Sequence, residues 1–316
     1  MKVVYMGTPD FAVETLREIV RNGHEVLAVV TQPDRPKGRG KTLKPTPVKE
    51  AAQKMGLVVY QYENVKNSDF MEVLKQLKPD VIVVAAFGQM LPREILDFPP
   101  YGCLNVHASL LPKYRGAAPI QWAVIRGEKE TGVTIMRMDE GLDTGDMLAE
   151  KVCALSPDET GGRLFDKLSV LGAELLAKTL DAITKGDIHA RPQPADSPTP
   201  YAAMIEKSMG RIDWEKDAYT IERLVRGMDP WPGAFTRLNG KMLKILKASV
   251  KNPKQAEGLA DAVPGQTVGT DRTGIYVKCA EGCLYIEKLQ LEGKKGMAAA
   301  DFLRGYRIEQ GTVLGS

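Results

Sequence analysis

An almost unbroken apolar run near position 80 constrains the fold of this chain more than any other feature. Residues 80–87 start at Asp80, continue through Val, Ile and Ala residues, and end at Phe87. A run of this kind is typical of a strand that is covered on both faces, and such strands occur in parallel sheets with helices on either side. The chain is therefore predicted to contain a buried parallel sheet.

Strand and helix patterns alternate around that run. Thr8 is predicted to cap the first helix, with Pro9 as its first residue and Gly23 at its end. Such alternation favours βαβ units, so we predict the α/β class with a Rossmann-like, doubly wound, mostly parallel sheet. The expected strands are 2–6, 26–31, 57–60, 80–87, 102–107, 131–138 and 147–155, and the other expected helices are 47–55, 68–78, 119–126 and 159–185.

The chain changes character after residue 185. Residues 186–200 hold one glycine and four prolines, a composition typical of a linker. Short β-rich runs follow and favour a small, OB-like β-barrel. We predict a first domain over 1–189, a linker over 190–205 and a β-barrel domain over 206–316. In that domain the expected helices are 219–228 and 298–304, and the expected strands lie near 234–238, 242–249, 266–270, 274–279 and 283–291.

Composition excludes several classes of protein. With 43% hydrophobic and 26% charged residues over 316 positions, the chain is predicted to be globular and soluble. It lacks the roughly 18 consecutive apolar residues that a membrane span needs, and its N-terminal apolar run is too short for a signal peptide. We therefore expect it in the cytoplasm. Its four cysteines fit a reducing compartment, and nothing completes a metal site around Cys279 and Cys283. The dinucleotide pattern G-x-G-x-x-G is absent after the first strand, which argues against a nicotinamide cofactor.

Two polar side chains share one face of the strand expected at 102–107. Asn105 and His107 are two residues apart, and side chains two apart in a strand point the same way. An amide and an imidazole at the carboxyl end of a buried strand could together hold an oxyanion that forms on a carbonyl under attack. The alternative is a core histidine beside an asparagine that forms a turn.

An acidic loop follows between the next two strands. Residues 139–146 hold four carboxylates and two glycines. A carboxylate that reaches His107 would fix its tautomer and could move a proton. The residues alone do not decide whether Asp139, Asp143 or Asp146 meets the histidine. A plain acidic turn is the alternative, because the pattern of a calcium loop is incomplete.

Basic residues cluster at two places. Residues 33–49 hold six basic residues, one acid, four prolines and two glycines, which predicts a long, mobile loop that clamps a phosphate backbone. Residues 230–256 hold basic residues and no acid, which is consistent with a surface for a polyanion. A loop or face that serves only solubility is the alternative in both cases. Trp231 could stack on a base, although domain packing is the commoner role for such a residue.

Six segments resemble the folate-dependent formyltransferase family over nearly the whole chain. They are 7–12 (GTPDFA), 31–36 (TQPDRP), 105–112 (NVHASLLP), 115–120 (RGAAPI), 141–146 (GLDTGD) and 229–232 (DPWP). The basic loop and the second domain narrow the resemblance to members that act on tRNA. It implies the formyltransferase fold, transfer of formyl from 10-formyltetrahydrofolate to methionyl initiator tRNA, and a monomer. The folate would be a substrate, with no tightly bound cofactor and no metal.

The resemblance also implies roles for individual residues. The catalytic ones would be Asn105, His107 and Asp143. Those at the folate would be Phe87, Gly88, Leu91, Ser109, Leu110, Leu111, Pro112 and Asp139. Arg39 would reach the acceptor stem of the tRNA. The positive charge of Lys41, Lys44, Lys244 and Lys247 makes them further candidates for contact with the tRNA. The main alternative is a formyltransferase for a small amine, such as an amino-sugar nucleotide or a purine precursor, which would not need the basic loop. An RNA-binding module without catalysis is a second alternative, against which the intact Asn, His and Asp set argues.

Overall fold

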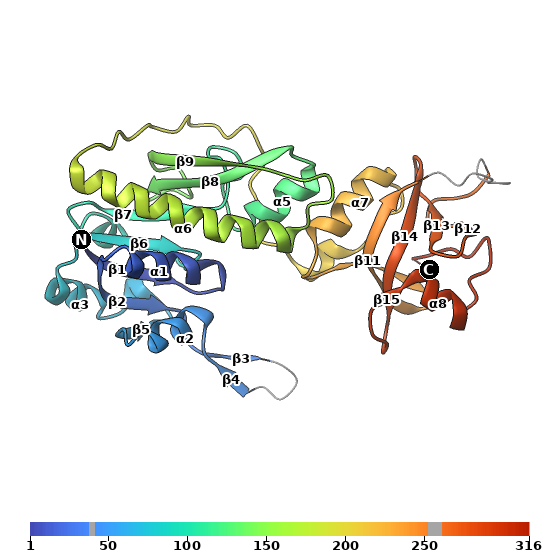
Figure 1. Ribbon diagram of the computed structural model, residues 1–316, viewed down its shortest axis with the longest axis horizontal. Helices are drawn as coiled ribbons and strands as arrows, with labels where there is room; N and C mark the ends of the chain where they lie inside the picture. Colours follow the sequence, from blue (N-terminus) through green and yellow to red (C-terminus); the bar gives the residue numbers. More distant parts are fainter. Residues whose placement is uncertain (38–41, 252–260, 316) are drawn as a thin grey trace. The chain divides into compact units, whose positions relative to one another are not determined.

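The computed structural model describes residues 1–37, 42–251 and 261–315 (Figure 1). The chain divides into two compact units. Unit 1 comprises Met1–Pro119, Glu130–Ala154 and Phe165–Ala202, and unit 2 comprises Ile120–Lys129, Leu155–Leu164 and Ala203–Ser316. Across the residues that the structure describes, no helix combines the length and the hydrophobicity that crossing a membrane requires.

Unit 1 contains a seven-stranded sheet in the order β5-β2-β1-β6-β7-β8-β9. The first five strands of that order pair in parallel, and β8 and β9 continue the sheet antiparallel. The predicted α/β class with a mostly parallel sheet is confirmed. The strands are β1 Lys2–Gly7, β2 Glu25–Thr31, β5 Val59–Gln61, β6 Val81–Ala85, β7 Cys103–His107, β8 Glu130–Arg137 and β9 Met147–Ala154.

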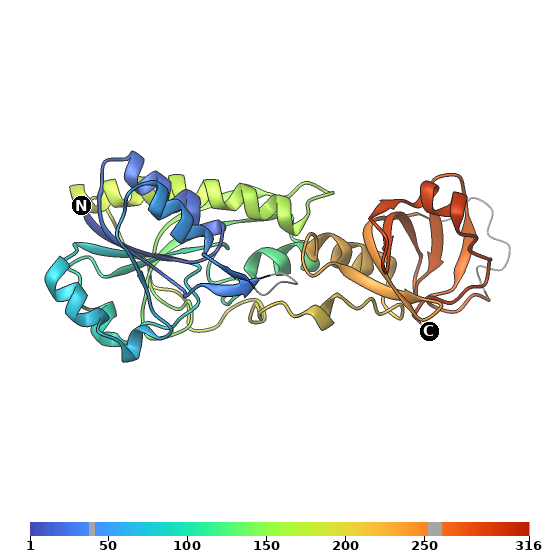
Figure 2. The same cartoon turned by 90° about the horizontal axis from the view of Figure 1, so that it is seen from below.

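Helices cover both faces of this sheet. Figure 2 shows α1 and α6 on one face and α3 on the other. All five residues of β6 are buried, and Ile82 and Val84 pack with Phe70 and Leu74 of α3. The apolar run near position 80 is thus the central strand that its pattern predicts. The helical elements up to residue 185 are α1 Phe11–Arg21, α2 Pro47–Lys54, η1 Val65–Asn67, α3 Phe70–Leu77, α4 Arg93–Leu96, α5 Pro119–Arg126 and α6 Gly161–Lys185. Residues 120–126 of α5 and 161–164 of α6 belong to unit 2.

The predicted start of the first helix is wrong. The helix begins at Phe11, with Asp10 as the preceding residue, so Thr8 is not its N-cap. The Thr8 hydroxyl instead donates a hydrogen bond of 3.1 Å to the Phe87 carbonyl oxygen. A partner on the neighbouring strand's loop outcompetes the local cap, and the bond ties the carboxyl ends of β1 and β6 together.

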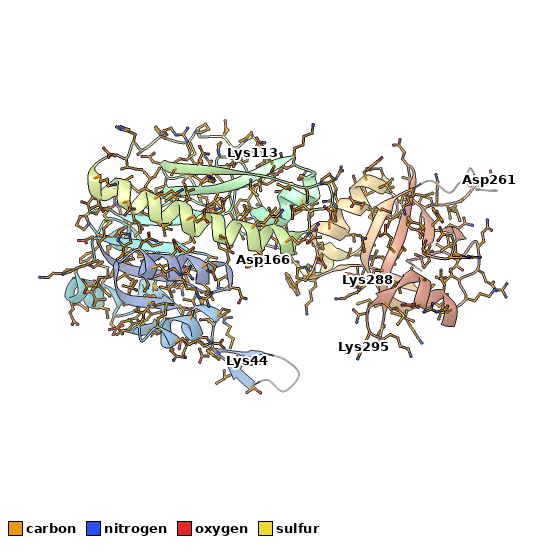
Figure 3. All side chains as sticks on the ribbon, viewed as in Figure 1. Lys44, Lys113, Asp166, Asp261, Lys288 and Lys295 are labelled. Carbon is orange, nitrogen blue, oxygen red and sulfur yellow. The ribbon has the colours of Figure 1, made fainter. Side chains whose placement is uncertain are left out.

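The basic segment after β2 is not a long loop. Its described part forms a two-stranded antiparallel hairpin of β3 (Arg35–Lys37) and β4 (Thr42–Lys44). The helix α2 follows at once, and the side chain of Thr46 caps it by accepting from the Lys49 amide. Figure 3 shows Lys44 on β4. Lys44 is exposed. Arg39 and Lys41 lie outside the described residues.

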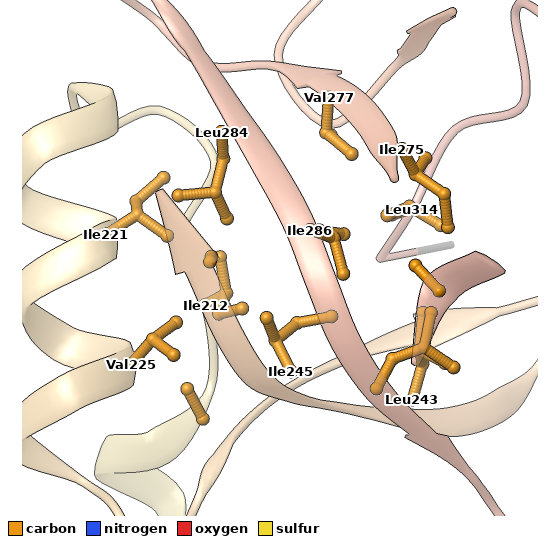
Figure 4. Close-up of a cluster of buried hydrophobic side chains, with 14 of the residues drawn as sticks. Ile212, Ile221, Val225, Leu243, Ile245, Ile275, Val277, Leu284, Ile286 and Leu314 are labelled. Carbon is orange, nitrogen blue, oxygen red and sulfur yellow. The ribbon is translucent and has the colours of Figure 1, made fainter. Parts of the chain in front are cut away.

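Unit 2 contains a six-stranded antiparallel sheet in the order β10-β11-β14-β13-β12, with β15 paired to β14. The five predicted strands of this region are all present. Ile221 and Val225 of α7 pack against Ile245, Leu284 and Ile286 of the sheet (Figure 4). The elements are η2 Lys207–Gly210, α7 Ala218–Gly227, β10 Ala234–Leu238, β11 Lys241–Val250, β12 Thr267–Thr270, β13 Ile275–Lys278, β14 Cys283–Leu291, β15 Met297–Ala298 and α8 Ala299–Gly305.

The proline-rich segment after α6 packs along unit 1. Residues 191–199, which we call the strap, have no regular secondary structure beyond a bridge between Arg191 and Met147. The side chain of Arg115 donates to the carbonyl oxygens of Pro194 and Ala195 at 2.7 and 3.0 Å. The sequence predicts a linker here, and its hydrogen bonds make the segment part of unit 1.

Candidate active site

The predicted amide and imidazole lie at the carboxyl end of β7. Parallel strands direct their carboxyl ends to one edge of the sheet, where ligands bind in folds of this type. His107 is the last residue of β7 and is buried, with an exposed fraction of 5%. Asn105 is only partly buried. The period of the strand thus brings both side chains to the same edge.

One carboxylate of the acidic loop meets both of them. Asp143 Oδ2 lies 3.6 Å from His107 Nδ1, and Asp143 Oδ1 accepts a long hydrogen bond of 3.5 Å from Asn105 Nδ2. The Gly116 amide donates to Asp143 Oδ2 at 2.8 Å. Asp143 has a left-handed backbone with φ of 55°, a conformation that is uncommon outside glycine. The structure therefore selects Asp143 from the three aspartates that the sequence leaves open.

The second ring nitrogen of His107 also faces an oxygen. His107 Nε2 lies 3.1 Å from the Tyr114 carbonyl oxygen. When Nε2 carries the proton it donates to this carbonyl, and Nδ1 faces the Asp143 carboxylate at 3.6 Å, a distance longer than a hydrogen bond. The buried ring is thus fixed from two directions.

Asp139 folds the acidic loop from within. Its Oδ1 accepts from the Gly141 amide at 3.0 Å and from the Thr144 hydroxyl at 2.7 Å. Asp139 and Asp146 are both exposed, whereas Asp143 is partly buried. Gly145 passes close under β8, because a Cβ at this position would lie 1.8 Å from the Arg137 carbonyl oxygen. The loop is built so that Asp143, between these turns, faces the histidine.

The segment after β7 is closed by hydrogen bonds. The Ser109 hydroxyl donates to the Lys113 carbonyl at 2.6 Å. Thr134 on β8 donates to the Ser109 carbonyl at 2.7 Å and accepts from the Leu111 amide at 3.1 Å. Ser109 and Leu111 are buried, whereas Leu110 and Pro112 are partly exposed. Of the four predicted folate contacts here, only the latter two present much side-chain surface.

The other predicted folate residues divide in the same way. Phe87 and Leu91 are 2% and 5% exposed and belong to the core between the sheet and α3. Gly88 between them is exposed. Met90 and Leu142 are 57% and 46% exposed, so they are apolar groups that a ligand could cover. Folate contact by this set stays a prediction.

Several residues at the site carry no signal in the sequence. Tyr114 and Gly116 contribute backbone atoms, a carbonyl oxygen and an amide. The Thr134 hydroxyl bonds to the backbone of Ser109. Gln193 lies in the strap, 50 residues from Asp143, and its side-chain amide donates to the Asp143 carbonyl. For Gly116 the structure explains why the residue is a glycine. Its φ is 125°, and a Cβ there would lie 2.5 Å from the Tyr201 ring.

Tyr201 borders the site from the end of unit 1. Its ring packs on Gly116, and the residue is 51% exposed. Partial burial raises the pKa of the Tyr201 hydroxyl, and the negative charge of Asp143 adds to that rise. The aromatic ring therefore lies near the carboxylate and offers an open face to a ligand.

The predicted tRNA-binding lysines differ in their surroundings. Lys244 Nζ donates to the Pro232 carbonyl at 3.0 Å, and Lys247 Nζ pairs with Glu287 at 2.9 Å. Lys44 makes no ion pair among the described residues. Trp231 is 53% exposed, so about half of its surface is open to a ligand or to another part of the chain.

Comparison with known proteins identifies the family. The profile described as "Formyl transferase" matches residues 1–180, and "Formyl transferase, C-terminal domain" matches residues 204–307. The chain belongs to the formyl transferase family. Within this family it is 52% identical over 312 residues to "Methionyl-tRNA formyltransferase" of Agathobacter rectalis, with 99% of each chain covered. It is 51% identical to the protein of that name from Geotalea uraniireducens, with 100% of this chain and 98% of the relative covered.

Two solved structures share the fold. An N-formyltransferase from Helicobacter canadensis, in complex with folinic acid and dTDP-3-aminofucose, gives a TM-score of 0.67 at 19% identity. The match covers 90% of this chain and 98% of that one. HypX from Aquifex aeolicus in complex with tetrahydrofolic acid gives 0.64 at 19% identity, covering 99% of this chain and 50% of its own.

Proposed function

We propose that this chain transfers a formyl group from 10-formyltetrahydrofolate to the free amino group of methionyl initiator tRNA. One observation carries the proposal. Asn105, His107 and Asp143 converge at the carboxyl edge of a parallel sheet, in a chain about half identical over its whole length to relatives with the printed name methionyl-tRNA formyltransferase. A small-amine formyltransferase would need the same three residues, so the acceptor is what an experiment must establish.

The reaction is an acyl transfer. The α-amine of the esterified methionine attacks the formyl carbon, and a C–N bond forms while the carbonyl oxygen becomes an oxyanion. The tetrahedral intermediate then collapses, the bond to N10 of the folate breaks, and the proton lost by the amine goes to N10. Because both reactants are held in one site, positioning supplies much of the rate enhancement.

The three side chains divide the work. Asn105 has a second amide hydrogen besides the one directed at Asp143, and it would donate this hydrogen to the oxyanion. His107, when protonated at both nitrogens, would add positive charge beside it. Asp143 would hold the imidazole and help to pass the proton from the amine to N10.

The two substrates would use different surfaces. The segments 87–91 and 109–112, with the loop 139–144, would line the folate site. Met90 and Leu142 are exposed there and fit an apolar ring. Arg39, Lys41 and Lys44 of the basic segment 33–49, with Lys244 and Lys247 of unit 2, would contact tRNA phosphates. We also propose that the enzyme is a cytoplasmic monomer.

The test is transfer of a labelled formyl group to three acceptors: charged initiator tRNA, free methionine and an amino-sugar nucleotide. We expect label in the tRNA fraction only. His107→Ala, purified in the same way, is the control for a contaminating activity. Transfer to the amino sugar but not to tRNA would refute the proposed acceptor, and transfer to neither would refute the proposed reaction.

A further inference from the structure

Two unusual backbone conformations meet at His107. Among the described residues, five other than glycine have a positive φ, and Tyr114 and Asp143 are two of them, at 57° and 55°. Tyr114 places its carbonyl oxygen against Nε2 of the ring, and Asp143 places its carboxylate against Nδ1. Residues in this region persist only where the surroundings hold them. The groups that hold Tyr114 and Asp143 therefore determine the orientation of the His107 imidazole.

The strap holds Asp143 through Gln193. The side-chain amide of Gln193 donates to the carbonyl oxygens of Asp143 at 3.0 Å and Gly145 at 2.7 Å. Its own oxygen accepts from Arg115 Nε and Nη2 at 3.1 and 2.9 Å. One side chain thus links the catalytic loop to Arg115, which is 8% exposed and has further bonds to the strap carbonyls.

The strap also holds Tyr114. The Tyr114 amide donates to the Thr199 hydroxyl at 2.7 Å, and the Ser197 hydroxyl donates to the Pro112 carbonyl at 2.8 Å. Gln193, Ser197 and Thr199 are the partly buried residues of the strap. Each of them bonds to a loop that contacts His107.

We infer that the strap is a positioning element of the active site and that Gln193 is a positioning residue for Asp143. Gln193 touches no reacting atom; it acts by fixing the backbone from which the carboxylate reaches His107. A connection between two domains would need only length and flexibility. The strap instead supplies hydrogen bonds to both left-handed residues. This inference rests on the proposed function for its kinetic part and on geometry alone for its structural part.

Two substitutions at Gln193 separate positioning from general packing. Gln193→Met removes every hydrogen bond at similar volume. Gln193→Glu keeps an acceptor for Arg115 and removes the donors to Asp143 and Gly145. Because misplacement of about 1 Å costs on the order of 10²-fold, we expect both to lower kcat by about that factor and to leave both KM values nearly unchanged. Wild-type kcat in Gln193→Glu would overturn the inference.

The strap offers a matched control and a second variant. Arg191 lies on the same segment, is exposed and pairs with Glu150, so Arg191→Gln should leave kcat unchanged. Thr199→Val removes the acceptor for Tyr114 at equal size and should lower kcat, whereas Thr199→Ser keeps the hydroxyl and should restore it. If serine and valine behave alike at position 199, the strap does not act through this bond.

Two further measurements exclude a merely structural role. If Gln193 acts through Asp143, Gln193→Met should cost nothing more in an Asp143→Asn background, and additive losses would refute the inference. The chain has three histidines, so the ¹H–¹⁵N imidazole signals of His107 can be followed apart from those of His24 and His189. We expect only the His107 signals to shift in Gln193→Glu, and unshifted signals would overturn the inference.

The imidazole spectrum also separates this inference from the proposed function. It requires neither the folate nor the tRNA. A wild-type chain that does not formylate charged initiator tRNA would refute the proposed acceptor, while a shift of the His107 signals in Gln193→Glu would still support the strap.

Discussion

Two segments leave the same edge of the sheet in unit 1 and differ in how their polar groups are used. The segment 108–116 follows β7, and its serine, arginine and backbone groups bond within unit 1. The basic hairpin follows β2, and β3 and β4 pair only with each other among the described strands. The first segment is prepared for chemistry before any substrate binds. The second presents its charge outward, as a surface for a polyanion should.

The largest effect should come from the segment whose geometry is fixed in advance. His107→Ala removes the group that both loops hold, and loss of one oxyanion-stabilising group costs about 10²–10³-fold in kcat. We expect a loss of this size in single-turnover transfer to charged tRNA, with little change in folate affinity. Lys44→Ala should leave kcat at saturating tRNA unchanged. Equal losses in the two variants would remove the distinction between the segments.

The next effect tests which carboxylate matters. Asp143→Asn should lower kcat by about 10²-fold, because an amide cannot carry the charge opposite His107. Asp139→Asn should cost less, since Asp139 bonds to Gly141 and Thr144 of its own loop. Asp146→Asn should cost least, as Asp146 is exposed and its carboxylate has no such bond among the described residues. The measurement is kcat for each variant beside its melting temperature, and three equal losses would mean that the loop matters only as a turn.

The sequence predicts the strands and the pair Asn105 and His107 better than it predicts the position of Asp143. The period of β7 predicts that Asn105 and His107 share a face, and hydrophobic runs predict all seven strands of the large sheet, with limits that shift by one or two residues at β5 and β6. Asp143 cannot be selected from the sequence, because its reach depends on a left-handed backbone to which Gln193 bonds and on the Gly116 amide, which donates to its carboxylate. Bonds from a residue 50 positions away leave no periodic pattern.

The hairpin escapes prediction for a related physical reason. Residues 33–49 hold four prolines and two glycines, which usually indicate irregular structure. β3 and β4 nonetheless pair with each other, over three residues on each side. The strap differs from its prediction for the converse reason. Its prolines predict a linker, and side chains that alternate with those prolines form hydrogen bonds to unit 1.

A moderate effect should follow from reversing charge on the hairpin. Arg35 and Lys44 lie on opposite strands as a register pair, and Lys44 is exposed. Arg35→Glu with Lys44→Glu should raise KM for tRNA while leaving KM for the folate unchanged. The slope of log affinity against log salt should flatten by about one unit for each phosphate that is no longer neutralised. An unchanged slope would mean that this surface does not bind the phosphate backbone.

The smallest effect should come from a lysine whose charge is already paired. The hydrogen bond and the charge of Glu287 raise the pKa of Lys247, and the pair holds Lys247 against its own sheet. Lys247→Gln should therefore flatten the salt dependence of tRNA binding less than Lys44→Gln does. Equal flattening by the two substitutions would show that the pairing does not limit Lys247.

The same pair gives a stability measurement with a defined sign. Burial alone would raise the pKa of Glu287, but bonds from Lys247 and Ser249 outweigh it and lower the pKa from its ordinary 4.5. The stabilisation is thus present above pH 4.5 and is lost as pH falls through the lower, folded-state pKa. Because Lys247 is 69% exposed, solvent screens the pair, and Lys247→Gln should cost about 1 kcal/mol of unfolding free energy or less at neutral pH. The cost should vanish in acid, and a cost that persists there would show that Lys247 stabilises unit 2 through its alkyl chain rather than its charge.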